Sequence, residues 1–196
     1  MSIKILCGLL LCPVNIWCSI GSVARGQTER SNGWGIAPPA TAMFRMKYSC
    51  DAESFAQQHV STCNPRPLPP YAMQGYKENI QVLRTVRTNQ GGAARNAMAT
   101  WWSELARFGM RSNMMFFDSE MRRGSRNVLK WSKMAWWNNR IVGCAVQDCG
   151  TFFLTVCMYK PGCDESNGIH RLENSCQILQ RQQRVTKRLQ SGSSML

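Results

Sequence analysis

The cysteines of this chain carry its clearest chemistry. Three of the ten lie in the first 24 residues, and the other seven are spread along the chain without a C-x-x-C pair or a partnering histidine. Zinc sites need closely spaced ligands, whereas dispersed cysteines in an oxidising compartment form a disulfide framework. The sequence therefore predicts disulfides, with one thiol left over, among Cys50, Cys63, Cys144, Cys149, Cys157, Cys163 and Cys176.

Residues arranged for catalysis are scarce. The chain contains no glycine-rich phosphate loop, no G-x-S-x-G nucleophile elbow and no cysteine with a credible histidine partner. Its two histidines, His59 and His170, are predicted to be surface or structural residues. The sequence therefore offers no pattern for catalysis through an activated nucleophile.

Basic residues dominate the charge. The net charge is +13, and a hydrophobic content of 44% indicates that this charge lies on a folded surface. No acid occurs between Met121 and Gln147, so this stretch is either a solvated face or a contact for an acidic glycan or lipid headgroup. Nucleic acid is disfavoured, because a secreted chain seldom meets it. The candidate surface residues are Arg122, Arg123, Arg126, Lys133 and Arg140.

The first 24 residues resemble a signal peptide. A short basic start at Lys4 precedes the apolar run "ILCGLLLC", and small residues follow at Ser22 and Ala24. Pro13 and Asn15 interrupt the run and disfavour a membrane-spanning helix. We therefore expect a leader over 1–24, a domain over 25–162, a basic tail over 163–196, and a secreted, extracellular protein.

Two helices are predicted in the first half of the domain. In 51–63, Ala52, Phe55, Ala56, His59, Val60 and Cys63 share one helical face, and the prolines after Asn64 prevent continuation. In 91–109, apolar residues recur at spacings of three and four, and Gly109 stands at the position of a C-terminal cap.

The second half of the domain reads as strands. After 111–121, which is apolar but aperiodic and predicted to be irregular, three strand-like runs cover 130–137, 140–147 and 151–159. Asn138 and Asn139 suit a tight turn between the first two runs. Helices followed by strands predict an α+β fold with an antiparallel sheet. In 177–196, disorder is favoured over a weak basic amphipathic helix.

Several motifs, in order, resemble the CAP superfamily, whose domain is also called SCP/TAPS. "KWSKMAWWNNRIVGCAV" is similar to its first signature and "FLTVCMYKPG" to its second, while "KENI" and "WWSELARFG" stand at its two glutamate motifs. The resemblance covers about 19–162 and is nearest to nematode activation-associated secreted proteins, also called venom allergen-like proteins. It implies a three-layer α-β-α sandwich with a central antiparallel sheet. The apolar leader occupies the place of the family's first helix, so its removal would truncate that helix.

The resemblance also implies a cleft. In the family, two histidines and two glutamates line it and can hold a divalent metal; the glutamates correspond to Glu78 and Glu104 here. Lys130 replaces one histidine, and the other is missing near 64–67, because His59 lies one helical turn too early. A lysine is a poor zinc ligand, so we expect no metal and no cofactor. Lys130 is expected to pair with Glu78 or Glu104; alternatively, it extends to solvent and the glutamates only hydrogen-bond.

The resemblance favours a secreted, non-enzymatic CAP-domain protein of nematode type that binds host or partner molecules. Nematode members of the family are associated with larval entry into hosts and with modulation of host immunity. An alternative is a sterol or lipid carrier, with a pocket lined by the methionines and phenylalanines of 108–121. A metal-dependent hydrolase acting through Glu78 and Glu104 is the least favoured alternative.

Overall fold

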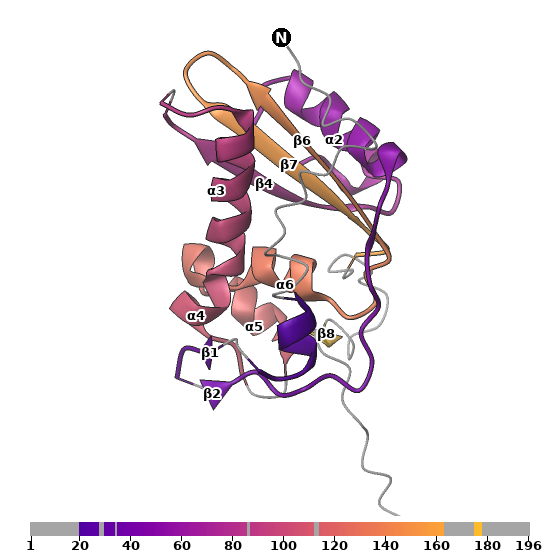
Figure 1. Ribbon diagram of the computed structural model, residues 1–196, viewed down its shortest axis with the longest axis vertical. Helices are drawn as coiled ribbons and strands as arrows, with labels where there is room; N and C mark the ends of the chain where they lie inside the picture. Colours follow the sequence, from indigo (N-terminus) through magenta and orange to yellow (C-terminus); the bar gives the residue numbers. More distant parts are fainter. Residues whose placement is uncertain are drawn as a thin grey trace, which may run out of the picture.

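A four-stranded sheet forms the centre of the molecule (Figure 1). The computed structural model describes residues 20–27, 30–33, 35–85, 87–111, 114–162 and 175–177. The sheet has the order β3-β6-β7-β4; β3 runs parallel to β6, and the other neighbours are antiparallel. Its strands are β3 (Lys47–Tyr48), β4 (Lys77–Leu83), β6 (Ile141–Asp148) and β7 (Phe153–Lys160).

Helices cover both faces of this sheet, as a three-layer sandwich requires. Figure 1 shows α2 (Cys50–Ser61) on one side of the strands and α3 (Gln90–Trp102) on the other. Below α3 lie α4 (Glu104–Phe108), α5 (Asp118–Met121) and α6 (Leu129–Ala135). Small two-stranded sheets pair β1 (Arg30–Ser31) with β2 (Gly35–Ile36), and β5 (Met115–Phe117) with β8 (Ser175–Gln177); the 3-10 turns are η1 (Pro70–Ala72) and η2 (Gly124–Arg126). No described helix is long and apolar enough to cross a bilayer.

The helix α2 packs directly on the backbone of β6. Ser49 caps it by accepting a hydrogen bond from the backbone N of Ala52, and its buried alanines face Val156 of β7. A Cβ added at Gly143 would lie 2.2 Å from the backbone N of Glu53, so only glycine permits this approach. The helix predicted at 51–63 is thereby confirmed, ending at Ser61.

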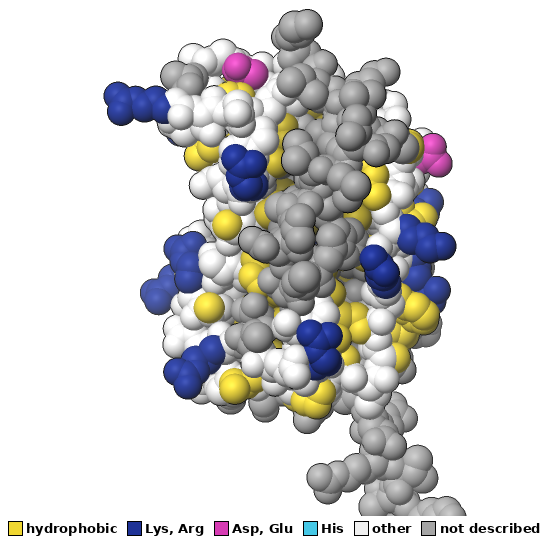
Figure 2. Space-filling model, viewed as in Figure 1, with side chains coloured by type: hydrophobic (Ala, Val, Ile, Leu, Met, Phe, Trp, Pro, Cys, Tyr) yellow, Lys and Arg dark blue, Asp and Glu magenta, His cyan; other side chains and the backbone are white. Residues whose placement is uncertain are grey.

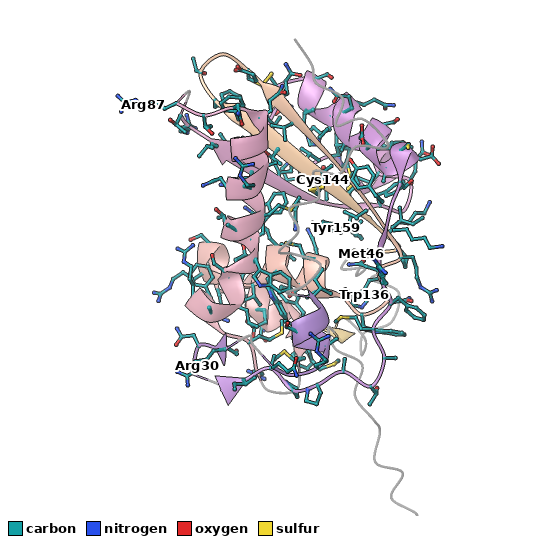
Figure 3. All side chains as sticks on the ribbon, in the orientation of Figure 1. Arg30, Met46, Arg87, Trp136, Cys144 and Tyr159 are labelled. Atoms are coloured by element: carbon teal, nitrogen blue, oxygen red, sulfur yellow. A yellow bond between two sulfur atoms is a disulfide. The ribbon has the colours of Figure 1, made fainter. Side chains whose placement is uncertain are left out.

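The opposite face of the sheet packs on α3 and α6. Along β7, Cys157 and Tyr159 point to this side, where they join Trp101 and Met46 in one buried cluster. Figure 3 shows Tyr159 and Met46 close together between the strands and α6. The strands predicted at 140–147 and 151–159 are confirmed as β6 and β7, the two central strands.

Three element predictions were wrong. The run 130–137 forms the helix α6 rather than a strand, because Trp131, Met134 and Ala135 are buried at helical spacing. The helix predicted at 91–109 is two helices, since Ser103 ends α3 with its hydroxyl bonded 2.9 Å from Thr100 O; Gly109 does cap α4, with a φ of 71°. The segment 111–121, predicted to be irregular, contains β5 and α5.

Disulfides tie the elements together. Cys63–Cys149 joins the end of α2 to the end of β6, and Cys144–Cys157 links β6 and β7 at directly paired positions. Cys50 is also disulfide-bonded. The side chains of Cys163 and Cys176 fall outside the described part of the chain, as do residues 1–19 of the predicted leader and the tail apart from the strand β8. Of the segment 177–196, which was predicted to be disordered, only Gln177 lies among the described residues, and it ends β8.

Candidate functional site

The first cleft carboxylate, Glu78, lies on the edge strand β4 and is 7% exposed. Its Oε2 is 2.9 Å from Nδ1 of His59, which projects from α2. Its Oε1 accepts a hydrogen bond of 2.6 Å from the backbone N of Leu68. Both carboxylate oxygens are therefore engaged by protein donors, and Glu78 holds the proline-rich loop 64–70 against the sheet.

His59 is buried among acceptors, with 3% of its surface exposed. Its Nε2 lies 3.1 Å from Asn64 O and 3.1 Å from Arg66 O, while Nδ1 faces the Glu78 carboxylate. His59 therefore links the Glu78 carboxylate to the backbone of the proline-rich loop.

The second cleft carboxylate, Glu104, begins the helix α4 and is also buried. Its Oε2 accepts hydrogen bonds of 2.9 Å from the backbone N of both Lys130 and Trp131. Burial raises the pKa of Glu104, while these N–H donors and the charge of Lys130 act to lower it. This carboxylate ties α4 to the first turn of α6.

Lys130 is half-buried on α6. Burial lowers the pKa of its ammonium, and the nearby charge of Glu104 acts in the opposite direction. Within the described residues, no direct ion pair or hydrogen bond of this ammonium is found with Glu78 or Glu104. The expected pairing is therefore limited to a longer-range interaction with Glu104.

A groove of about 740 Å³ opens between the proline-rich loop, β4 and α6. Its charged lining consists of Lys77, Lys130, Lys133 and Glu78, and Lys133 Nζ donates to the backbone O of Glu78 at 3.4 Å. Apolar side chains from all three elements complete its walls, among them Leu68, Met73, Ile80, Val82 and Leu129. The groove thus combines a basic end with apolar walls.

The predicted basic surface residues occupy different environments. Arg122 and Arg126 are exposed near η2, and Lys133 lines the groove. Arg123 is used internally, because it contacts Glu120 at 2.7 Å and donates to the backbone O atoms of Gly109 and Phe108.

Arg140 stacks on the ring of Phe44, with 3.3 Å from its Cζ to the ring centroid. Figure 2 shows Lys and Arg side chains dispersed over the visible face, with few acids among them. The five predicted basic residues therefore do not form one continuous surface with a shared environment.

The methionine- and phenylalanine-rich segment 108–121 contributes three side chains to the core, whereas its last residue, Met121, is exposed. Met110, Met114 and Phe116 are almost completely buried, together with Trp131 and Leu105. None of the described residues of this segment lines the groove.

Metal ligands do not converge in the described part of the chain, where no group of three or more His, Cys, Asp or Glu side chains could hold an ion.

The sequence analysis did not predict that His59 is the partner of Glu78. Its place on the buried face of the helix, with Ala56 and Val60, was the signal that could have revealed a buried partner.

Comparison with known proteins adds a consistent set of relatives. The profile of the cysteine-rich secretory protein family, CAP, matches residues 24–159. Ancylostoma secreted protein of Ancylostoma caninum is 33% identical over 141 residues, and Hookworm platelet inhibitor 1 of the same species is 28% identical over 138. The chain spans 33% of the length of the first and 61% of the second.

Solved structures of similar proteins share the fold. NaASP2, crystallised with Zn²⁺, has a TM-score of 0.73 and 27% identity, with 86% of this chain and 83% of that chain covered. Na-ASP-1 has a TM-score of 0.70 and 30% identity, with 76% of this chain and 39% of that chain covered. The α+β sandwich predicted from the motifs is thereby confirmed.

Proposed function

The chain belongs to the cysteine-rich secretory protein family, CAP, and from that membership we propose that it is a secreted, non-enzymatic protein that acts by binding host or partner molecules. The disulfides of the described residues support an oxidising, extracellular setting. The relatives' names describe a secreted protein and an inhibitor of platelets, which supports a target outside the cell that produces this chain.

The hydrogen bonds of Glu78 and Glu104 support the proposal that the protein is not an enzyme. Both oxygens of Glu78 are engaged by His59 and Leu68, and the bonded oxygen of Glu104 serves two backbone donors. A hydrolytic base or metal ligand needs a carboxylate that can turn toward substrate or ion. Glutamates held in this way act as structural links.

The cation of Lys130 supports a cleft without metal. A relative was crystallised with zinc, but a zinc ion requires neutral imidazole, thiolate or carboxylate donors. Lys130 presents a cation at the position of a cleft histidine, and Nδ1 of His59 already lies 2.9 Å from the Glu78 carboxylate. We therefore propose that this chain needs neither metal nor cofactor.

Activity assays on the oxidised protein test the proposal. We expect no hydrolysis of casein or p-nitrophenyl acetate above buffer, with or without added zinc. Labelled protein should bind host cell surfaces saturably, and excess unlabelled protein should compete. Hydrolysis that a chelator and Glu104→Ala both abolish would overturn the non-enzymatic part, and binding without saturation would overturn the other.

We propose sterol carriage as the second candidate function, and the apolar groove walls, which include Leu68, Ile80 and Val82, support the groove as its site. Met110, Met114 and Phe116 of the segment 108–121 pack in the core instead of lining the groove. Native mass spectrometry of protein exposed to sterol tests this alternative, and the absence of a bound complex would remove it.

A further inference from the structure

We propose that the outer edge of β4 binds an extended, acidic peptide segment of a partner protein, which adds to the central sheet as a further strand. This inference rests on the proposed binding function and names the chemistry of the partner. An edge strand carries backbone N–H and C=O groups that no neighbouring strand uses. Another extended main chain fits such an edge, because its donors and acceptors repeat at the same spacing.

The pairing of the sheet determines where the backbone groups of β4 point. Val142 O of β6 accepts a hydrogen bond of 2.9 Å from Ser49 N, so Val142 directs its backbone groups to the β3 side. In an antiparallel pair, opposite residues both point inward or both point outward, in alternation along the strands. Tyr159 of β7 lies opposite Val142 and therefore points toward β4, where it pairs with Lys77.

Alternation along β4 then directs the backbone groups of Glu78, Ile80 and Val82 away from β7. An independent contact agrees, since Lys133 Nζ donates to the backbone O of Glu78 at 3.4 Å. Val82 O accepts a long bond of 3.5 Å from Nε2 of Gln81. The backbone N and O of Ile80 have no hydrogen-bond partner among the residues that the structure describes. The middle of this edge therefore offers a donor and an acceptor to an added strand.

The groove lies along the same edge. Six consecutive residues of β4, 77–82, line it, although neighbouring side chains of a strand point to opposite faces. Ile80 packs with Leu68 on the α2 face, whereas Asn79 Nδ2 donates to Lys130 O on the α6 face. A cavity that is lined from both faces borders the edge of the strand. An added strand would therefore have the proline-rich loop beside one face and α6 beside the other.

The charges around the groove favour an acidic peptide over a basic one. Lys77, Lys130 and Lys133 line the groove together with Glu78, and the charge of Glu104 interacts with Lys130 and Lys133 from within the fold. With both glutamates counted, the lysines exceed the carboxylates by one, on a chain whose net charge is +13. This small excess disfavours basic peptides and favours acids at the positions that face α6.

Calorimetric titration of the oxidised full chain, in buffer containing EDTA, tests the proposal with heptapeptides, which match the seven residues of β4. The acidic probe alternates valine and glutamate, begins and ends with valine, and is acetylated and amidated. We expect saturable binding that is at least about tenfold weaker when lysine replaces glutamate. Amide hydrogen exchange of Ile80 and Val82 should slow in the complex, because the added strand bonds their outward N–H groups.

N-methylated probes distinguish strand addition from unspecific attraction to a basic chain. Alternate amides of a bound strand face β4, and the others face away. One isomer carries N-methyl groups at its valines and the other at its glutamates; one of the two should bind at least about tenfold more weakly than the other. Weakening of the valine isomer indicates an antiparallel peptide with valines on the α2 face, and weakening of the glutamate isomer indicates a parallel one.

Two variants of one residue locate the site. Ile80→Pro removes an outward N–H without removing a bond to β7, as an edge strand permits. Ile80→Ala loses the same side chain but keeps the N–H. We expect Ile80→Pro to bind the acidic probe at least about tenfold more weakly than Ile80→Ala does. Thermal unfolding verifies the fold of both variants, and the methylated probes decide the matter if the proline variant is unfolded.

Equal binding of the two methylated isomers would overturn the inference, and so would unchanged hydrogen exchange at Ile80 and Val82. Failure of the acidic heptapeptide to bind would also overturn it. The proposed function survives these results if labelled protein still binds host cell surfaces saturably, because that binding is measured separately. Loss of both kinds of binding would remove the two proposals together.

Discussion

His59 Nδ1 lies 2.9 Å from Glu78 Oε2, and this buried pair joins α2 to the edge strand of the sheet. Because Glu78 also holds Leu68, the pair organises the loop that forms one wall of the groove. The imidazole of His59 thus occupies one side of the Glu78 carboxylate.

Removing His59 should destabilise the protein strongly. We expect His59→Phe to lower the free energy of unfolding by about 3 kcal/mol, because Glu78 becomes a buried charge without its partner. The double variant with Glu78→Gln should recover about 1 kcal/mol or more. Urea unfolding measures both, and Gln58→Ala on the exposed face of α2 serves as a neutral control. Additive effects of the two substitutions would contradict the pairing.

Zinc should not bind the wild-type protein. In a calorimetric titration we expect no heat of binding for the wild type, and a measurable affinity for Lys130→His, which supplies an imidazole near Glu104. Lys47→His, with a histidine on the exposed strand β3, controls for binding at an isolated surface imidazole. Tight binding by the wild type would mean that the ligands rearrange and that the proposed metal-free cleft is wrong.

Glu104 should make stability fall as the pH rises above 4.5. Burial raises its folded pKa above that ordinary value, so the folded state holds the proton more tightly than the unfolded state does. The stabilisation is complete below pH 4.5 and is lost as the pH rises through the folded value. Glu104→Gln keeps an oxygen for the two N–H donors and should remove this contribution. Urea midpoints from below pH 4.5 to neutrality measure it, and identical slopes would refute it.

Gly143 should tolerate no side chain. We expect Gly143→Ala to lower the free energy of unfolding by about 3 kcal/mol, because its Cβ would overlap the backbone of Glu53 and push α2 from the sheet. Gly91→Ala, in α3, meets no such contact and should stabilise the protein by about 0.5 kcal/mol. Chemical unfolding compares the two, and equal effects would show that α2 adapts without cost.

The two described disulfides should contribute different amounts to the free energy of unfolding. Cys63–Cys149 closes 86 residues and Cys144–Cys157 only 13, so the loop-entropy relation gives the first about 1.7 kcal/mol more stabilisation. Replacing each pair by alanines and measuring urea unfolding tests this order. The reverse order would indicate that packing at the buried Cys144 and Cys157 outweighs chain entropy.

Local patterns were sufficient for much of the fold. The buried face of α2, the cap at Gly109 and the apolar runs of β6 and β7 are written in neighbouring residues, so helix and strand periods revealed them. The run 130–137 was wrongly predicted to be a strand. Its tryptophans and β-compatible residues fit both the helical and the strand period as long as their burial is unknown. Only packing on α3 and β4 makes that run a helix.

The sequence by itself determined the family, the helix α2 and the strands β6 and β7, and its motifs singled out Glu78 and Glu104, since these depend on residue types at short spacing. Tertiary structure alone decided what those glutamates do. His59 and Glu78 are 19 residues apart and Glu104 and Trp131 are 27 apart, so no local pattern could pair them. Their contacts arise only when the sheet and helices pack, because burial then requires each carboxylate to find a donor.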